Sequence, residues 1–279
     1  MLWKDEGRSA NLEDRRGFGG RAGMGIGGTA VLLILSLVFG RNFFDDVGTG
    51  ATTVSQSNGS LSPADSAREE PQVRFVSFVL NDAQATWKQI LPQYGAKYHD
   101  AGLVLFRGAT ETGCGTGQTA MGPFYCPLDE KVYIDLEFYD ELKTKFSAAG
   151  DFAQAYVIAH ELGHHVQHIL GTDAQMRQSA QRDSRRQNEL SVKLELQADC
   201  YAGVWGHSTQ QRNKLQPGDI EEGLNAAASV GDDRIQKRTT GRVSTESFTH
   251  GSSAQRTSWF KKGFDAGDPR ACDTFGAGG

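Results

Sequence analysis

The chain has 279 residues and a mass of 30.3 kDa, enough for one large domain whose interior can hold a catalytic site. With 38% hydrophobic and 23% charged residues and a mean hydropathy of −0.46, the composition excludes a polytopic membrane protein and a disordered chain. Lys and Arg number 29 against 34 Asp and Glu, a formal net charge of −5, so we expect no nucleic-acid partner.

One apolar stretch near the N-terminus predicts a membrane span. Residues 22–40 read AGMGIGGTAVLLILSLVFG without a charge, and as a helix they would cover roughly 28 Å at about 1.5 Å per residue. Several Lys and Arg residues precede the stretch, whereas none follows Arg41 until Arg68. The positive-inside rule therefore predicts a cytoplasmic tail over 1–21 and an extracytoplasmic domain, in a single-pass protein of the inner (cytoplasmic) membrane.

A buried core helix and a cleaved signal peptide explain the same stretch less well, because it lacks polar interruptions and a small-residue cleavage site. Gly19, Gly23 and Gly27 match small-xxx-small spacing, which would allow a homodimer through this segment. Residues 41–72 are mostly small and polar, which predicts a flexible linker. The folded domain is then expected over residues 73–279.

Hydrophobic periodicity and helix caps predict an α+β domain. We expect strands over 73–80, 103–107 and 131–135, the last (KVYID) alternating like an edge strand. A helix opened by an Asn81/Asp82 cap should end near Pro92, and residues 173–188 should form an exposed excursion. Further helices are expected over 137–146, 151–170, 190–205, 219–229 and 253–264.

The helix expected over 151–170 carries an HExxH motif, His160-Glu161-Leu162-Gly163-His164. Histidines at i and i+4 lie on one helix face about one turn apart, so both imidazoles can bind one zinc ion. Glu161 lies on the same side and can contact a metal-bound water without being a ligand, which is the position of a general base. A chance match or a structural histidine pair is the alternative interpretation.

A catalytic zinc site needs a third protein ligand. His168 lies too far along the helix to converge with the other two histidines, and position 170 is Leu where a metzincin would have histidine. Glu195 and Asp199 share a helical face in the segment ELQAD. We expect Glu195 to bind the metal, with Glu189 as the reserve ligand, and Asp199 to accept the Nδ1–H of a ligating histidine.

Several segments together resemble the bacterial family of putative neutral zinc metallopeptidases: HELGHHVQ, ELQADCYAGVW, GPFYCPLDEKVYIDLEFYDEL and SFTHGSSAQRTSWFKKGFDAGDPRACDTF. The similarity includes the N-terminal KDEGRSANLEDRRG and so covers nearly the whole chain. It implies a zincin-like fold with a small sheet on the HExxH helix, one Zn²⁺ bound by His160, His164 and Glu195, and Glu161 as the base. It implies no particular substrate.

The expected activity is hydrolysis of peptide bonds by a membrane-anchored zinc endopeptidase that acts on protein or peptide substrates. The oxyanion of the reaction needs a further donor, for which His250 is the first candidate, with His207 and Tyr201 behind it. The KVYID strand could bind an extended substrate by edge pairing. The alternatives are a zinc-stabilised scaffold module that does not cleave and a zinc amidase for cell-wall peptides.

The four cysteines form no CxxC pair, so they are not expected to bind metal. Cys114 and Cys126 bracket a short Gly-rich loop and are predicted to form a disulfide, which leaves Cys200 to pair with Cys272. Two disulfides would fit a domain outside the reducing cytosol.

Overall fold

The structure is a computed structural model that describes residues 1–17 and 62–276, and its fold is α+β. A four-stranded sheet has the order β1-β2-β6-β5. The strands are β1 (Leu12–Asp14), β2 (Gly102–Phe106), β5 (Phe124–Cys126) and β6 (Lys131–Asp135). β1, β2 and β6 are parallel, and β5 is antiparallel to β6. A separate hairpin joins β3 (Ala109–Thr112) to β4 (Gly115–Gln118).

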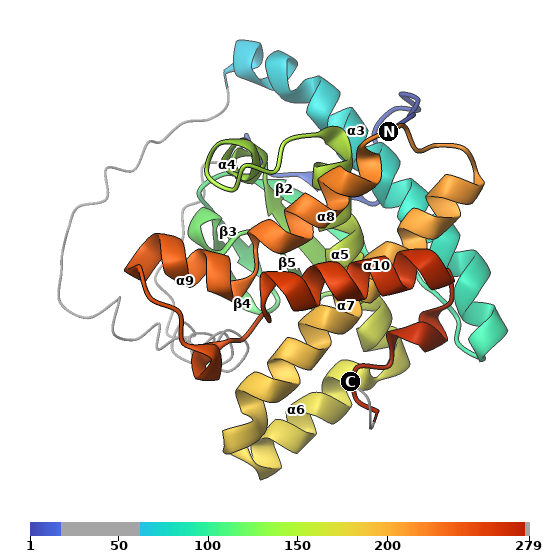
Figure 1. Cartoon of the computed structure of the whole chain (residues 1–279). Helices are drawn as coiled ribbons and strands as arrows, with labels where there is room; N and C mark the ends of the chain where they lie inside the picture. Colours follow the sequence, from blue (N-terminus) through green and yellow to red (C-terminus); the bar gives the residue numbers. More distant parts are fainter. Residues whose placement is uncertain (18–61, 277–279) are drawn as a thin grey trace.

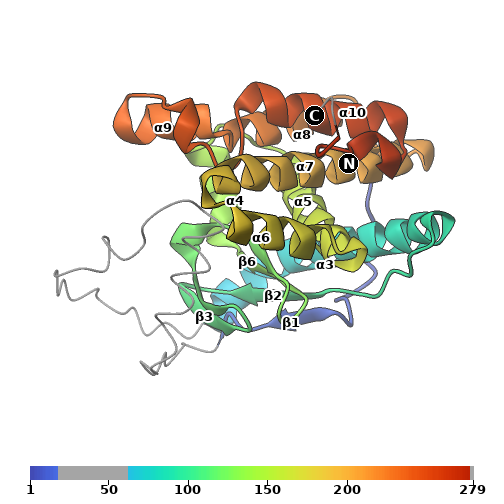
Figure 2. The ribbon, with the colours of Figure 1, turned by 90° about the horizontal axis from the view of Figure 1, so that it is seen from below.

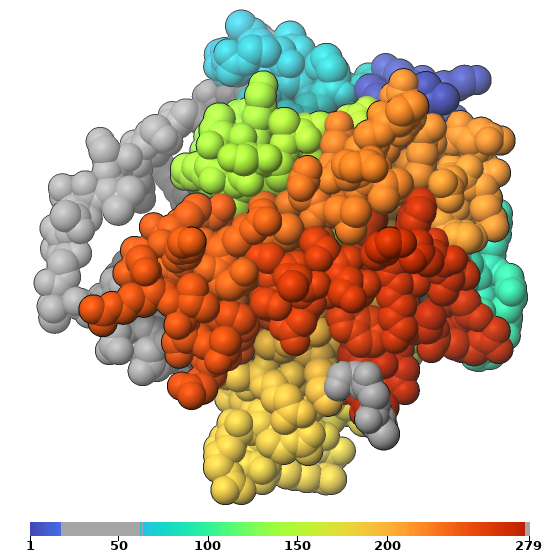
Figure 3. Space-filling view, in the orientation of Figure 1, coloured from blue at the N-terminus to red at the C-terminus, as the bar shows by residue number. Residues whose placement is uncertain are grey.

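The helices form layers on the sheet (Figures 1 and 2). They are α3 (Pro63–Ile90), α4 (Glu137–Thr144), α5 (Asp151–Leu170), α6 (Thr172–Arg182), α7 (Gln187–Gln211), α8 (Asp219–Ser229), α9 (Asp232–Thr240) and α10 (Ser253–Ala266). Figure 2 shows α5 in the middle of the molecule, with the sheet on one side and α7, α8 and α10 on the other. The C-terminal part of the chain forms most of the face seen in Figure 3. The central helix is therefore covered on both sides.

Two close helix contacts fix the positions of α5, α7 and α10. A Cβ added at Gly163 of α5 would lie 3.0 Å from the carbonyl oxygen of Ala198 in α7. A Cβ at Gly263 of α10 would lie only 1.9 Å from the carbonyl oxygen of Cys200 in α7. Only glycine permits the second contact without a shift of the backbone, and the two contacts hold these helices against one another.

The helices predicted over 151–170 and 219–229 are confirmed, and α5 ends as expected at Gly171 in the left-handed conformation. The strand predicted over 73–80 is wrong, because these residues belong to α3. Ser62 caps this helix by accepting a hydrogen bond from the backbone N–H of Asp65, so no helix begins at Asn81. The expected linker accordingly ends before Pro63 instead of at residue 72.

Two smaller predictions also need correction. The excursion expected over 173–188 is mostly helical, because α6 covers Thr172–Arg182 and α7 begins at Gln187. The KVYID strand, β6, is not an edge strand, since it lies between β2 and β5. β5 occupies the edge that the sequence pattern assigned to β6.

The N-terminal segment, residues 1–17, is part of the folded domain. β1 pairs with β2, and the Trp3 ring packs edge-on against Phe75 of α3 at 5.4 Å. Arg16 is 2% exposed, and its side chain donates to Asp14 and, at 2.6 Å, to Glu69 of α3. A tail held on the opposite side of a membrane from the domain could not make these contacts. Residues 1–17 therefore have to be counted with the domain that the sequence analysis began at residue 73, and the predicted sides of the membrane stay a prediction.

The predicted span over 22–40 and the glycines Gly19, Gly23 and Gly27 lie outside the described residues. Within residues 1–17 and 62–276, no helix is both long enough and apolar enough to cross a membrane.

Candidate metal centre

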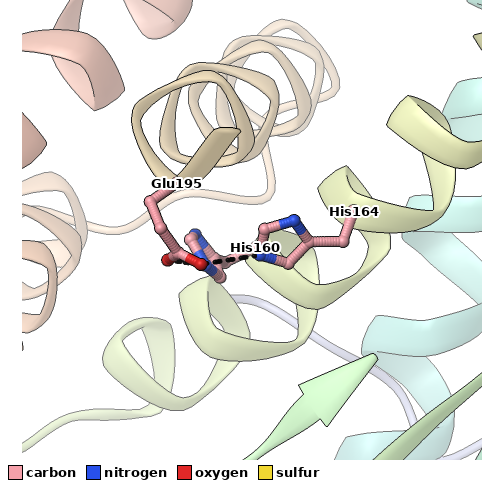
Figure 4. Close-up of side chains that lie close together, drawn as sticks. All are labelled: His160, His164 and Glu195. Carbon is pink, nitrogen blue, oxygen red and sulfur yellow. Dashed lines mark ion pairs between the residues drawn. The ribbon is translucent and has the colours of Figure 1, made fainter. Parts of the chain in front are cut away.

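Two helices bring His160, His164 and Glu195 together, as the sequence predicts. Both histidines project from α5 and Glu195 from the facing α7, and the three side chains point toward one another (Figure 4). His160 Nε2 lies 3.2 Å from Glu195 Oε2, and His164 Nε2 lies 3.4 Å from Glu195 Oε1. One ligand atom from each residue lies within 4.8 Å of the others. Two imidazoles and one carboxylate in this arrangement are a donor set typical of zinc.

His160 is oriented by Asp199, the residue that the sequence singled out for this role. Its Nδ1 lies 2.9 Å from Asp199 Oδ1. An ionised carboxylate only accepts hydrogen bonds, so Nδ1 carries a proton and Nε2 is the nitrogen that faces Glu195 and could bind a metal. The hydroxyl of Tyr156 also donates to Asp199 Oδ1, and the Arg256 guanidinium donates to both oxygens of this fully buried carboxylate.

His164 is oriented by Gln167, which the sequence analysis missed. The amide nitrogen of Gln167 donates to the backbone oxygen of Leu194 at 2.7 Å, so its Oε1 faces His164 Nδ1 at 2.8 Å and accepts from it. Gln167 lies three residues after His164 on the same helix face, which is a signal present in the sequence. Both imidazoles thus present Nε2 to the centre of the cluster.

Burial and neighbouring charges shift the pKa values of the cluster. Burial alone lowers the pKa of His160, but the hydrogen bond and charge of Asp199 outweigh it and raise that pKa to about 10. Burial raises the pKa of Glu195, yet the two facing imidazoles lower it well below its ordinary value. Glu195 is therefore ionised, and a divalent cation bound here would displace a proton from His160.

Glu161 follows His160 in α5 and is 7% exposed. Burial raises the pKa of its carboxyl group, although the charges of His160 and His164 act in the opposite direction. A carboxylate with a raised pKa accepts a proton more readily near neutral pH, which is what a general base requires.

The other predicted site residues are not part of the cluster. His168 pairs with Asp173, and Glu189 is exposed and pairs with Lys193. His207 Nδ1 contacts the backbone oxygen of Phe264 at 2.7 Å, and the Tyr201 ring packs against Trp87. These contacts assign His207 and Tyr201 to the packing around α7.

His250 belongs to a loop fixed by Asp232 at the start of α9. The Asp232 carboxylate accepts the backbone N–H groups of Thr249, His250 and Gly251, and its Oδ1 lies 3.0 Å from His250 Nδ1. The Ser191 hydroxyl, one helical turn before Glu195, donates to the backbone oxygen of Thr249 at 2.9 Å. The loop that carries His250 therefore packs on the helix that supplies the carboxylate of the cluster.

A second acidic group is formed by Asp151, Asp219 and Glu222. The N-terminal ammonium of Met1 lies 2.5 Å from Asp151 Oδ1 and 3.2 Å from Asp219 Oδ1. Glu222 accepts the backbone N–H of Phe152. Groups of the chain itself therefore bind these three carboxylates.

Both predicted disulfides are present. Cys114 pairs with Cys126 and joins β5 to the β3–β4 hairpin. Cys200 pairs with Cys272 and holds the C-terminal segment beside α7, where Gln197 donates to the backbone oxygen of Cys272.

The fold and the cluster define an α+β protein with a candidate His-His-Glu metal centre on an HExxH helix. Over residues 1–275 the chain matches the family described as "Putative neutral zinc metallopeptidase". At 50% identity over 288 aligned positions, it is similar to uncharacterized protein YpfJ of Escherichia coli strain K12, with 99% of each chain covered.

A second relative is uncharacterized protein Rv2575 of Mycobacterium tuberculosis strain H37Rv. It is 47% identical over 208 aligned positions, which cover 71% of this chain and 68% of the relative. No solved structure matches the chain significantly. The chain belongs to the putative neutral zinc metallopeptidase family.

Proposed function

We propose that this protein is a zinc-dependent peptidase of the zincin type, in which His160, His164 and Glu195 hold one Zn²⁺ and Glu161 is the general base. The observation that carries the proposal is the convergence of these three ligand side chains from α5 and α7, with both Nδ1 atoms occupied by Asp199 and Gln167. Zinc bound to such a donor set lowers the pKa of a water ligand toward about 7 and polarises a substrate carbonyl.

Glu161 carries out both proton transfers, and other residues keep the metal ligands in position. Glu161 accepts the proton of the attacking water and delivers it to the amine that leaves when the peptide bond breaks. Its burial favours the protonated form, which supports its second role as the acid. His160 and His164 keep their orientation throughout, because Asp199 and Gln167 hold their outer nitrogens.

His250 remains the candidate donor for the oxyanion. Its Nδ1 faces the carboxylate of Asp232 at 3.0 Å, which fixes the orientation of the ring. Packing of its loop on Ser191, one turn from Glu195, supports this role.

The substrate is proposed to be an extended peptide that pairs with β5. Among the described strands, β5 is an outer strand of the sheet. It lies beside α5, because the Tyr125 hydroxyl contacts His165 Nδ1 at 2.8 Å in the turn after His164. An outer strand next to the catalytic helix is a template for main-chain pairing.

The protein is proposed to be attached to a membrane through residues 22–40, with its catalytic domain in an oxidising extracytoplasmic compartment. The uncharged apolar sequence supports the attachment, and the two disulfides support the compartment. Since residues 1–17 pack on the domain, they should share its compartment.

The decisive substitution is Glu161→Gln, because it removes the base and leaves the ligands intact. The variant should bind one Zn²⁺ per chain as the wild type does, while cleavage of a peptide library falls by at least about 100-fold. Glu221→Gln, an exposed acid on α8, is the matched control and should retain full activity. Equal cleavage by wild type and Glu161→Gln would contradict the proposal. Zinc binding without cleavage in either protein would indicate a scaffold module.

A further inference from the structure

Arg256 is a buried cation next to the cluster of His160, His164 and Glu195, and the sequence motifs give it no role. It projects from α10, is 3% exposed, and lies 57 positions after Asp199 in the sequence. Its position in space is fixed by the helix, which begins with a capping box between Ser252 and Gln255 and contacts α7 through Gly263. A buried guanidinium is costly unless all its partners are well arranged.

All but one of the partners of Arg256 named here belong to the cluster or hold its ligands in place. Nε donates to Asp199 Oδ2 at 2.8 Å and Nη2 donates to Asp199 Oδ1 at 2.9 Å, a two-point contact that only a guanidinium can make. Nη2 also lies 3.3 Å from the Tyr156 hydroxyl and 3.7 Å from Glu195 Oε2. Nη1 donates to the backbone oxygen of Val230 at 3.4 Å.

These contacts limit which further groups the Asp199 carboxylate can bind. Its Oδ1 accepts from Arg256, Tyr156 and His160, and its Oδ2 accepts from Arg256, so both oxygens are engaged. It is therefore not free to turn toward a metal and compete with Glu195. Without the guanidinium, a buried carboxylate one turn from Glu195 would have lost its main counter-charge.

The formal charges around the cluster support the same role. Three carboxylates lie there, Glu161, Glu195 and Asp199, and all three are buried or nearly so. A divalent cation and one guanidinium would bring three positive charges to these three carboxyl groups, whereas the cation alone would bring two. Glu161, Glu195 and Arg256 thus belong to one electrostatic unit.

We propose that Arg256 is a positioning residue of the metal centre, which locks Asp199 as the orienter of His160 and so sets the zinc affinity and the turnover rate. The inference rests on the proposed function and deepens it. Arg256 acts on His160 through Asp199, and its Nη2 also lies 3.7 Å from Glu195 Oε2.

The test compares zinc binding by full-length wild type, Arg256→Met and Arg256→Lys, measured by competition with a chromophoric chelator. Arg256→Met should weaken zinc binding by 10- to 100-fold, the range typical of lost outer partners of metal ligands. Arg256→Lys keeps the charge but not the two-point contact, so its zinc affinity should lie between those of the wild type and Arg256→Met. Arg270→Met, an exposed arginine that pairs with Asp268, is the matched control and should bind zinc as the wild type does.

Two further readouts separate positioning from general destabilisation. The visible absorption spectrum of the Co²⁺-loaded protein should change in Arg256→Met and Arg256→Lys, because the orientation of His160 changes, and should be unchanged in the control. The double variant Arg256→Met/Asp199→Asn should bind zinc no more weakly than the weaker single variant, since both act on one contact.

Wild-type zinc affinity and an unchanged Co²⁺ spectrum in Arg256→Met would overturn the inference, as would additive effects in the double variant. If Arg256→Met does not fold, Arg256→Lys decides by the same two readouts. Neither readout needs catalysis, so an absence of peptidase activity in the wild type would contradict the proposed function and leave this test intact.

Discussion

Gln167 shows how one side chain outside the HExxH motif can determine what the motif does. Its amide nitrogen is held by the backbone oxygen of Leu194 and also lies 3.1 Å from Gln197 Oε1, so its oxygen has to face His164. This arrangement keeps the proton of His164 on Nδ1 and leaves Nε2 for the metal. It also ties α5 to α7 beside the cluster.

We predict that Gln167→Leu weakens zinc binding by 10- to 100-fold while the chain stays folded. The leucine fills the same volume but cannot accept from His164. Zinc affinity is measured by chelator competition, and circular dichroism checks the fold. Gln178→Leu on the exposed surface of α6 is the control. An affinity equal to that of the wild type in Gln167→Leu would show that this hydrogen bond does not orient the ring.

At the residue scale, the spacing along a single helix predicted which side chains share one of its faces. His160 and His164 are four apart, as are Glu195 and Asp199, and both pairs share a face as expected. Arg256 could not be predicted in this way, because its contact with Asp199 depends on how α10 packs on α7. Contacts between helices that are distant in sequence leave no periodic signal along the chain.

At the scale of elements, α3 shows why a local pattern can mislead. Residues 73–80 are almost continuously apolar and rich in valine and phenylalanine, which is typical of a buried strand. They form a helix buried on more than one side, with Trp3 on Phe75 and a core of valines at positions 73, 76 and 79. The spacing of three between these valines fits a helix, and a helix buried all round loses the polar face that would have revealed it.

The charged group at Asp82 links α3 to the end of α7. Arg212 and Lys214 both donate to the buried Asp82 carboxylate, and so does the Trp205 indole. Burial raises the pKa of Asp82, but the hydrogen bonds from Arg212 and Lys214 outweigh it and lower the pKa below its ordinary value. The stability that this group contributes is therefore present above pH 4 and is lost as the pH falls through the lowered pKa.

We predict that Asp82→Asn lowers the free energy of unfolding by about 2–3 kcal/mol at pH 7, because two cations lose their buried partner. The difference from the wild type should shrink as the pH falls below about 4, because the Asp82 carboxyl of the unfolded wild type takes up a proton at a higher pH than that of the folded protein. Urea unfolding at pH 7 and pH 3 measures both values. Asp265→Asn, an exposed partner of Lys261, should change stability by less than about 0.5 kcal/mol. A difference that is equal at the two pH values would contradict this assignment.

At the scale of the whole molecule, the N-terminal segment and the helical domain form one body. β1 adds an outer strand to the sheet, and Leu103 donates its backbone N–H to the carbonyl of Asn11 at 2.8 Å. The charge pattern around residues 22–40 predicted opposite sides of a membrane for the two segments, because it reads only neighbouring Lys and Arg residues. It carries no information on strand pairing over some 90 residues.

We predict that residues 1–17 and the domain lie on the same side of the membrane. Single cysteines introduced at exposed Lys4 and at exposed Gln210 of α7 should react equally with a membrane-impermeant maleimide on intact cells, before any permeabilisation. A cytoplasmic protein with a reactive thiol controls for leakage. Labelling of one position only after lysis would show that the two segments are separated by the membrane.

His160, His164 and Glu195 are proposed to bind one zinc ion, since their ligand atoms lie within 4.8 Å of one another. X-ray absorption at the zinc K-edge, on the full chain loaded with one equivalent of Zn²⁺, tests it most directly. The spectrum should show two imidazole ligands at about 2.0–2.1 Å, oxygen ligands at similar distances and no sulfur, and Glu195→Ala should bind zinc far more weakly. A spectrum with sulfur ligands near 2.3 Å, or one unchanged by His160→Ala and His164→Ala, would contradict the account.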